Sequence, residues 1–351
     1  MNFPDLHRHL GGATHARILW GWIEKHGRQT ATAARLREQF PDYAAFSYFF
    51  NRPFTDLADY LTVHHLVEEL QSEELAYFTH RAVRGAAVFE ALDYLELRFN
   101  PYKRTPISLP EAERLALMPE AAQQVIHAAQ TEFPIHTAFI LCMDRGFTPA
   151  LNRQIIALAK ALPEVVAVDL AGPYQPGGPT LDQWAELYAE AKSLGLHTTA
   201  HMAESDPADI HPSLFPYLER IGHGIQIALH RPDLLPELAE RGICLEVCPT
   251  TYLRTNTLRD LAELRPVFER CAAAGVAISI ATDNPALHGE AGKLVNEYEK
   301  LVRAEAIHFN DILAHAAVGY KFAFRVSAGT DREISRKMGV KQGVPQDAKS
   351  H

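Results

Sequence analysis

The sequence has no long apolar run and only four cysteines, and these absences argue against several classes of protein. None of its apolar runs approaches the roughly eighteen residues of a membrane-spanning helix. The first ten residues, MNFPDLHRHL, contain neither the basic nor the apolar segment of a secretory signal peptide. The cysteines form no CxxC pair, so a thiolate zinc site or a redox motif has little support. We expect a cytoplasmic protein with no membrane partner, whose reduced thiols are mostly buried.

The sequence also lacks a surplus of basic residues. Its 34 lysines and arginines are outnumbered by 43 aspartates and glutamates, and the formal net charge is -9. Binding to DNA or RNA needs a basic face, so this balance argues against a nucleic acid as the main partner. A small molecule, phosphorylated or not, is compatible with it. No feature of the sequence specifies an oligomeric state.

The chain does contain a regular alternation of short apolar runs with longer amphipathic segments. Segments such as NRQIIALAKAL and LDQWAELYAEAKSLG space their apolar residues three and four apart, which predicts helices. Gly195, Gly242 and Gly275 stand just before apolar runs, where glycines that end helices are expected. Eight strand–helix alternations predict an α/β fold, the parallel (β/α)8 barrel of the TIM type. The predicted strands are 5–9, 94–99, 136–142, 165–171, 196–201, 220–224, 243–248 and 277–282.

The segment between the first two predicted strands, residues 14–90, is much longer than the others. We expect it to add helices that cover the mouth of the barrel, and VHHL at 63–66 to lie within one of them. No repeat or linker divides the chain, and single α/β barrels often reach this length. We therefore predict one domain over residues 1–340 and a polar tail over residues 341–351.

The first predicted strand ends in two histidines that share a face. His7 and His9 are two residues apart, so both side chains point to one side of the strand. They lie near its C-terminal end, where this fold carries its chemistry. Alone, such a pair is more often packed or hydrogen-bonded near a strand end. A metal site becomes the better interpretation only if other strands end in ligands.

Three later strands do end in such residues. His201 ends the fifth run, His223 lies in the sixth, and Asp283 follows the eighth. The C-terminal ends of parallel barrel strands meet at one mouth, so these residues are expected to converge there. Three neutral imidazoles and one carboxylate suit zinc and leave a position for water. A chance scatter of the 18 histidines would rarely produce this set.

A set of ordered motifs extends from about residue 4 to residue 298. The motifs are DLHRHLGGA, YLELRFNP, ILCMDRG, VDLAGP, HMAE, RIGHG, LEVCPTT, TDNPALHG and KLVNEYE. In this order and spacing they resemble the adenosine and AMP deaminase family of the metal-dependent amidohydrolases. One such motif would carry little weight, but the ordered set is specific.

The resemblance implies a role for each of these site residues. Glu204 would protonate N1 of a purine ring, His223 would orient or deprotonate the attacking water, and the Gly172 N–H would meet purine N3. The chemistry is consistent, because zinc lowers the pKa of water to about 7 and a general acid at N1 contributes ~10²–10⁴-fold. One zinc ion per chain would be held by His7, His9, His201 and Asp283, the last of which is also counted as catalytic.

Several departures from the family pattern concern substrate contacts. Gly11, in HLGG, replaces a carboxylate that meets the ribose 5′-hydroxyl, so we expect open space and one negative charge fewer there. Asn284 replaces a carboxylate at purine N7, to which its amide can donate a hydrogen bond. Ala203, in HMAE, adds a methyl group near the site. The pattern suggests retained chemistry on an altered substrate, such as a 5′-modified nucleoside.

The resulting hypothesis is the zinc-dependent hydrolytic deamination of a 6-aminopurine nucleoside, adenosine or a 5′-modified analogue, to the 6-oxo product and ammonia. The same chemistry on a free aminopurine base or another amino-heterocycle is one alternative. A second alternative is hydrolysis of an amide, ester or lactone, against which the absence of a lysine at the end of the fourth strand argues. A third is a non-catalytic barrel that binds zinc and a ligand, which would need neither Glu204 nor His223.

The motif YLELRF places two opposite charges on the second predicted strand. Glu96 and Arg98 are two residues apart and share a face of that strand. We expect them to pair with each other inside the barrel rather than to take part in catalysis.

Overall fold

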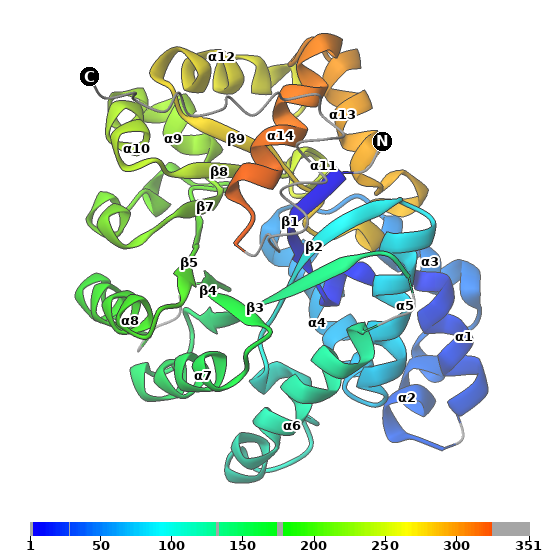
Figure 1. Ribbon diagram of the computed structural model, residues 1–351. Helices are drawn as coiled ribbons and strands as arrows, with labels where there is room; N and C mark the ends of the chain where they lie inside the picture. Colours follow the sequence, from blue (N-terminus) through cyan, green and yellow to red (C-terminus); the bar gives the residue numbers. More distant parts are fainter. Residues whose placement is uncertain (1–2, 28, 131–132, 174–177, 325–351) are drawn as a thin grey trace, which may run out of the picture.

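The computed structural model describes residues 3–27, 29–130, 133–173 and 178–324. Their parallel strands form two sheets, ordered β1-β2-β3-β4-β5 and β6-β7-β8-β9 (Figure 1). Most strand residues are buried, as expected where helices cover one face of a sheet and a packed interior the other. The strands are β1 (Phe3–His9), β2 (Leu92–Phe99), β3 (His136–Asp144), β4 (Val165–Ala171), β5 (His197–Thr198), β6 (His201–Met202), β7 (Arg220–His223), β8 (Cys244–Val247) and β9 (Ala277–Ile280).

Backbone hydrogen bonds connect the two sheets. Strands β5 and β6 are two pieces of one predicted strand, and between them Thr199 N donates to Val168 O at 3.0 Å. On the other side of the ring, His9 N donates to Asp283 O at 2.8 Å, which joins β1 to the chain after β9. The hydrogen-bonded order therefore runs around the barrel. The predicted TIM-type (β/α)8 fold is confirmed.

The predicted insertion consists of helices with a hydrophobic core of their own. Its core includes Trp20, Phe46 and Phe78. Several of these helices begin at capping side chains; Asp56, for example, accepts a hydrogen bond from Asp59 N at 2.9 Å. The helices between β1 and β2 are α1 (Ala16–His26), α2 (Ala31–Gln39), α3 (Tyr43–Asn51), α4 (Leu57–Gln71) and α5 (Leu75–Val88).

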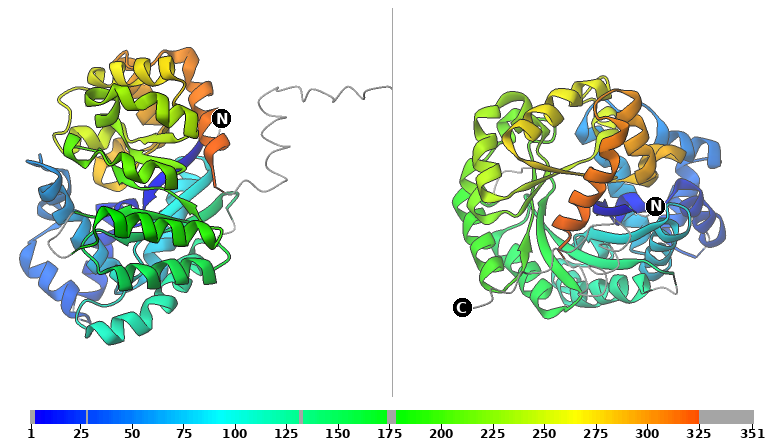
Figure 2. Two further views of the ribbon diagram at one scale, coloured as in Figure 1. Left: turned by 90° about the vertical axis from the view of Figure 1, so that its left-hand side faces the viewer. Right: turned by 45° about the horizontal axis from the view of Figure 1, so that its top comes forward.

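The remaining helices alternate with strands and surround the barrel (Figure 2). Gly242 and Gly275 end α10 and α12 with φ of 69° and 80°, and Gly195 follows the last residues of α8 with φ 80°. These left-handed positions confirm the predicted helix ends. The helices are α6 (Glu111–Ala129), α7 (Pro149–Ala161), α8 (Leu181–Ser193), α9 (Ile225–His230), α10 (Leu235–Arg241), α11 (Pro249–Arg254), α12 (Arg265–Ala274), α13 (Leu294–Arg303) and α14 (Ile312–Phe322).

The barrel interior holds charged side chains that are fully buried, and here one prediction is wrong. Glu96 and Arg98 do not pair with each other. Arg98 pairs with Asp169 at 3.1 Å and with Glu246 at 2.9 Å, whereas Glu96 pairs with Arg220. Residues two apart on a strand are separated by about 6.6 Å along it, so partners on other strands across a narrow barrel lie nearer.

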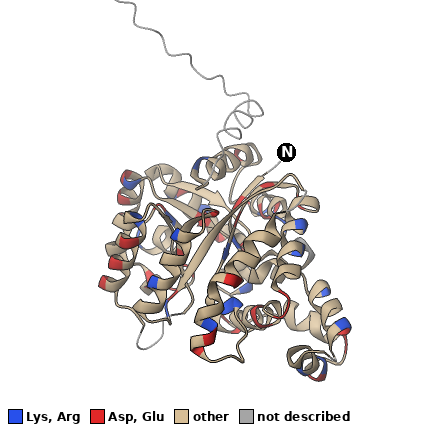
Figure 3. Cartoon of the chain, turned by 60° about the horizontal axis from the view of Figure 1, so that its bottom comes forward, with Lys and Arg blue, Asp and Glu red and all other residues tan. Residues whose placement is uncertain are grey.

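Acidic and basic residues are interspersed over the helices (Figure 3). Among the described residues, no helix is both long and apolar enough to span a membrane. All four cysteines are buried, as predicted. The tail predicted over residues 341–351 lies outside the described residues.

Candidate active site

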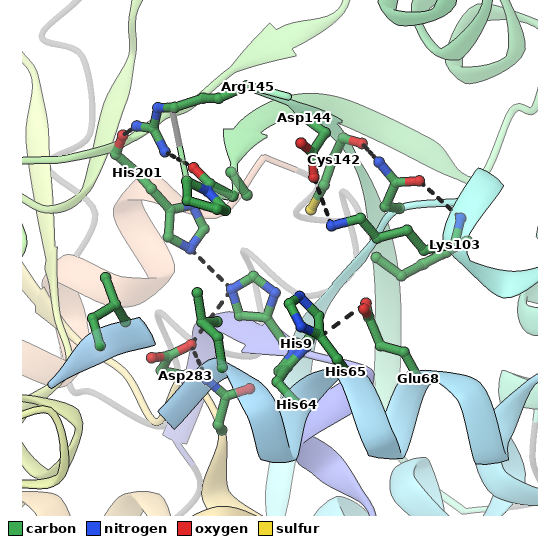
Figure 4. Close-up of a pocket in the computed structure, with 18 of the residues that line it drawn as sticks. His9, His64, His65, Glu68, Lys103, Cys142, Asp144, Arg145, His201 and Asp283 are labelled. Carbon is green, nitrogen blue, oxygen red and sulfur yellow. Dashed lines mark hydrogen bonds and ion pairs between the residues drawn. The ribbon is translucent and has the colours of Figure 1, made fainter. Parts of the chain in front are cut away.

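A pocket lies at the C-terminal ends of the strands, where the sequence predicts the site (Figure 4). Helix α4 of the insertion forms one wall of it, as expected for a segment that covers the mouth. The strand ends contribute His9, His201, Glu204, His223, Asp283 and Asn284, and α4 contributes Leu57, Tyr60, Leu61, His64, His65 and Glu68.

The four predicted metal ligands converge at this pocket, with His9, His201 and Asp283 in its lining and His7 fully buried beside them. His201 Nε2 lies 2.9 Å from His9 Nε2 and 3.2 Å from His7 Nε2. Asp283 Oδ1 lies 3.4 Å from His9 Nε2 and 3.7 Å from His7 Nε2. Two overlapping sets can hold a metal ion: one is His7, His9 and His201, and the other is His7, His223 and Asp283. The structure therefore brings together residues from β1, β6, β7 and the end of β9.

Carboxylates behind two of these histidines fix the orientation of their rings. His7 Nδ1 lies 2.6 Å from Glu246 Oε2, and His201 Nδ1 lies 3.0 Å from Asp169 Oδ2. Burial raises the pKa of Asp169, but His201 and Arg98 outweigh it and hold that pKa well below its usual range. When each Nδ1–H donates to its carboxylate, the two Nε2 lone pairs face each other at 3.2 Å. A cation between them removes this repulsion, so the arrangement fits a metal ion.

Burial keeps three of the imidazoles neutral. It is the main cause of a pKa well below 6.5 for His7, His9 and His223, and neighbouring histidines and Arg98 lower each pKa further. A neutral imidazole is the form that binds a metal or accepts a proton. His7, His9 and His223 are therefore in this form at neutral pH, whereas for His201 burial lowers the pKa but Asp169 outweighs it and raises that pKa above 6.5.

Glu204 is the predicted proton donor, and its surroundings suit that role. Burial first, and then the charge of Asp283, raises the pKa of Glu204 to about 8. Its Oε2 lies 3.6 Å from His223 Nε2. Within the described part of the chain, the buried Nδ1 of His223 has no hydrogen-bond partner. A carboxyl group that keeps its proton at pH 7 thus stands beside an imidazole that does not.

The backbone is strained at three positions around the site. Ala203, His223 and Asp283 have φ of 55°, 66° and 59°, in the left-handed region that non-glycine residues seldom adopt. They lie at or just beyond the ends of β6, β7 and β9. Each such position costs on the order of 1–3 kcal/mol and persists only where the surrounding structure enforces it. Ala203, where the sequence departs from the family pattern, is thus one of the three strained positions.

Two of the predicted substrate contacts line the pocket. Asn284 Nδ2 donates to Asp283 Oδ1 at 2.7 Å, so one of its amide hydrogens is already engaged. Gly172 has φ 81°, and a Cβ there would lie 2.7 Å from Asp144 Oδ2. Both the backbone conformation and the lack of space require glycine at this position.

The third predicted contact, Gly11, is buried and does not line the pocket. The open space expected beside it is absent, and that expectation was wrong. A Cβ on Gly11 would lie 2.6 Å from His64 Cε1, because the His64 ring fills this position. The sequence could not show that a residue 53 positions away occupies the space that a missing side chain leaves.

Several polar residues that line the pocket were not predicted from the sequence. His64 and His65 were expected only as parts of a helix, and both line the pocket from α4. Lys103, in the short 3-10 helix after β2, and Asp144, the last residue of β3, also line the pocket (Figure 4). The one available indication was the prediction that the insertion covers the mouth, since polar side chains on it would then face a ligand.

Comparison with known proteins defines the family. The family model described as adenosine deaminase matches residues 4–336. The chain belongs to the adenosine deaminase family. Its membership, together with the barrel and the site at the strand ends, establishes an adenosine-deaminase-like hydrolase that acts on C–N bonds.

Individual members of the adenosine deaminase family match over most of their length. An adenosine deaminase of Vibrio cholerae is 28% identical over 333 residues, which cover 91% of this chain and 92% of the relative. An aminodeoxyfutalosine deaminase of Streptomyces coelicolor is 30% identical over 336 residues, or 93% and 81% of the two chains. A solved Burkholderia ambifaria amidohydrolase with bound zinc shares the fold, with TM-score 0.74, 23% identity and coverage of 96% and 89%.

Proposed function

We propose that this chain is a zinc-dependent aminohydrolase that converts a 6-aminopurine nucleoside to its 6-oxo product and ammonia. The observation that carries the proposal is a protonated carboxyl group beside a cluster of neutral imidazoles. Glu204, with a pKa of about 8, lines the same pocket as His9 and His223, whose pKa values burial lowers well below 6.5. A non-catalytic binding barrel would need no such pairing of an acid and a base.

The residues that would hold one zinc ion are His7, His9, His201 and Asp283, whose donor atoms already converge. When bound, zinc lowers the pKa of water to about 7 and so supplies hydroxide at neutral pH. The carboxylates Glu246 and Asp169 orient two of the ligands by accepting from the Nδ1 atoms.

The chain's own residues would handle the protons. Glu204 would donate its proton to purine N1 as the attacking water adds to the ring, since negative charge would otherwise build up there. His223, which burial keeps neutral, would accept a proton from that water. Asn284 has a second amide hydrogen for the ring nitrogen N7, and the Gly172 N–H would bind N3.

The charges around the pocket favour a substrate whose ribose end is uncharged. A 5′-phosphate needs cations that are free to bind it. The cations that line this pocket already face carboxylates, so a phosphate would have to displace one of them. The pairs are Lys103 with Asp144 at 2.6 Å, Arg104 with Glu68 at 3.2 Å and Arg145 with Asp209 at 3.7 Å. We therefore propose adenosine or a neutral 5′-modified analogue as substrate, in preference to a nucleotide.

An ammonia-release assay tests this assignment. The panel would contain adenosine, 5′-deoxyadenosine, 5′-methylthioadenosine, AMP, adenine and aminopyrimidines, and we expect the highest kcat/KM with a neutral nucleoside. A higher value for AMP would contradict the charge argument, and a higher value for adenine would favour a free-base deaminase. If no compound of the panel releases ammonia, the remaining hypothesis is the non-catalytic barrel that binds zinc and a ligand.

We also propose that residues 1–340 form a single deaminase domain, followed by the polar tail at 341–351. The family match over residues 4–336 supports the extent proposed for the deaminase domain. Limited proteolysis would test both, because cleavage is expected after about residue 340 and not between the strands of the barrel.

A further inference from the structure

Ala323 and Phe324, the described residues that follow α14, lie at the end of the barrel opposite the pocket. In the right-hand view of Figure 2, α14 lies across the middle of the barrel. Arg220, the first residue of β7, donates from Nη1 to Phe322 O at 2.8 Å, and the Phe324 ring lies over its guanidinium at 3.5 Å. Phe324 N donates to Glu96 Oε1 at 2.7 Å. The His197 ring stacks on the Phe324 ring at 4.6 Å with an interplanar angle of 7°.

A chain of buried ion pairs connects the residues in contact with Phe324 to the metal site. Glu96 pairs with Arg220, and Arg220 Nε lies 2.7 Å from Glu246 Oε1. The other oxygen of the same carboxylate, Glu246 Oε2, lies 2.6 Å from His7 Nδ1. These four side chains are fully buried. One carboxylate thus contacts the cation under Phe324 with one oxygen and a predicted metal ligand with the other.

A second branch reaches another ligand. Arg98 Nη2 donates to Glu246 Oε2 at 2.9 Å, and Arg98 Nη1 donates to Asp169 Oδ2 at 3.1 Å. Asp169 in turn holds His201. Arg98 is anchored independently of Phe324, because it also donates to Leu6 O at 2.7 Å. The branch that depends on the closing segment is therefore the one through Arg220 to His7.

The residue most affected by loss of the Phe324 ring is Arg220. A buried guanidinium keeps its carboxylate partners because no water competes for it, and attraction between charges is strong where water is excluded. The face of an aromatic ring excludes water and attracts the cation. Without the Phe324 ring, water can solvate Arg220, and Glu246 Oε1 then loses its fixed ionic partner.

We propose that Phe324 is a positioning residue for the metal site. Its ring excludes water from the Arg220 guanidinium and fixes the position of that group. Arg220 in turn fixes the carboxylate of Glu246, which orients His7. The inference rests on the metal site of the proposed function. It assigns to Phe324 a role in retaining the metal ion, in addition to its packing at this end of the barrel.

The test compares two nearby phenylalanines, Phe322 at the end of α14 and Phe324 beyond it, in the zinc-loaded, full-length chain. Phe322 packs against the cluster of Leu6, Tyr94 and Ala138, and its backbone carbonyl accepts a hydrogen bond from Arg220. Phe322→Ala therefore removes a similar apolar ring without exposing the guanidinium face. Zinc release to a chromophoric chelator gives the rate, the cobalt-substituted chain gives a ligand-field spectrum, and thermal unfolding gives Tm.

We expect Phe324→Ala to release zinc about tenfold faster than the wild type, the lower end of the cost of losing an outer partner of a metal ligand. The cobalt spectrum should change as well. Phe322→Ala, with a comparable fall in Tm, should release zinc at nearly the wild-type rate. Phe324→Tyr, which keeps the aromatic face, should restore wild-type release, and Phe324→Leu covers the case in which the alanine variant does not fold.

Equal zinc release from Phe324→Ala and Phe322→Ala at equal Tm would overturn the inference, as would a wild-type chain that binds no zinc. A chain that binds zinc and shows the expected difference, yet deaminates no aminopurine, would contradict the proposed function and leave the positioning role of Phe324 intact.

Discussion

At the scale of single residues, burial decides which protons the site can use. It opposes the charged form of every group, so it raises the pKa of Glu204 and lowers the pKa of His223. An acid that holds its proton and a base that lacks one result from the same effect on groups of opposite charge type. The two side chains lie only 3.6 Å apart.

The first prediction separates proton donation from metal binding. Glu204→Gln keeps the size of the side chain and removes the acidic proton, so kcat should fall by about 10²–10⁴-fold while zinc content and Tm stay near the wild-type values. Steady-state kinetics and metal analysis of one preparation provide the measurement. Glu68→Gln is the control for a neutralised carboxylate in the same pocket. Turnover close to that of the wild type would remove Glu204 from the proposed mechanism.

The second prediction concerns the carboxylate behind His201. Asp169→Asn weakens the acceptor that orients this ring, and zinc affinity should fall about 10–100-fold. Glu237→Gln is a control, because Glu237 Oε1 accepts a hydrogen bond from Arg241 Nε at 2.9 Å in an exposed pair on α10, which does not line the pocket. Competition with a zinc chelator measures both. An equal loss of zinc affinity in the two variants would show that the contact between Asp169 and His201 has no specific effect on zinc binding.

The third prediction follows from the close approach of Gly11 and His64. Gly11→Ala places a Cβ 2.6 Å from His64 Cε1, so the ring must move, and we expect a loss of about 1–3 kcal/mol in the free energy of unfolding. In the double variant with His64→Ala the added methyl group has room, so the two costs should not add. Urea unfolding of the four chains measures this coupling. Additive costs would mean that the ring is not held against Gly11.

At the scale of elements, α4 shows how the insertion affects the pocket. Its N-terminus is capped by Asp56, and it carries His64, His65 and Glu68 into the pocket wall. Its position therefore depends both on the packing of the insertion core and on the geometry of its first turn. A change in this helix should alter substrate binding even where it touches no substrate.

The fourth prediction tests this dependence through the cap. Asp56→Ala removes the hydrogen bond to Asp59 N and should cost about 1 kcal/mol of stability. Thr180→Ala removes the cap of α8, which does not line the pocket, and should cost about the same. We expect KM for the best nucleoside to rise in Asp56→Ala and to stay constant in Thr180→Ala. A constant KM in both variants would show that the position of α4 does not depend on its cap.

At the scale of the whole molecule, the sequence predicts what depends on strand order and little of what depends on distance across the barrel. His7, His201 and Asp283 could be placed together because parallel strands end at one mouth. The partners of Glu96 and Arg98 could not be found, because contacts across the interior depend on the closure and width of the ring. Likewise, only the folded insertion shows that His64 occupies the space beside Gly11.

The last prediction concerns the metal and the stability of the whole chain. We expect one zinc ion per chain, and above its Kd each tenfold rise in free zinc should add about 1.4 kcal/mol to the free energy of unfolding. The reason is that the donor atoms of His7, His9, His201 and Asp283 converge only in the folded chain, so zinc binds the folded state and not the unfolded one. Asp283→Ala should weaken this zinc dependence, and magnesium, which prefers oxygen ligands, should not replace zinc. Metal analysis and zinc-dependent unfolding measure these quantities, and two ions per chain or stability independent of zinc would contradict a single-ion site.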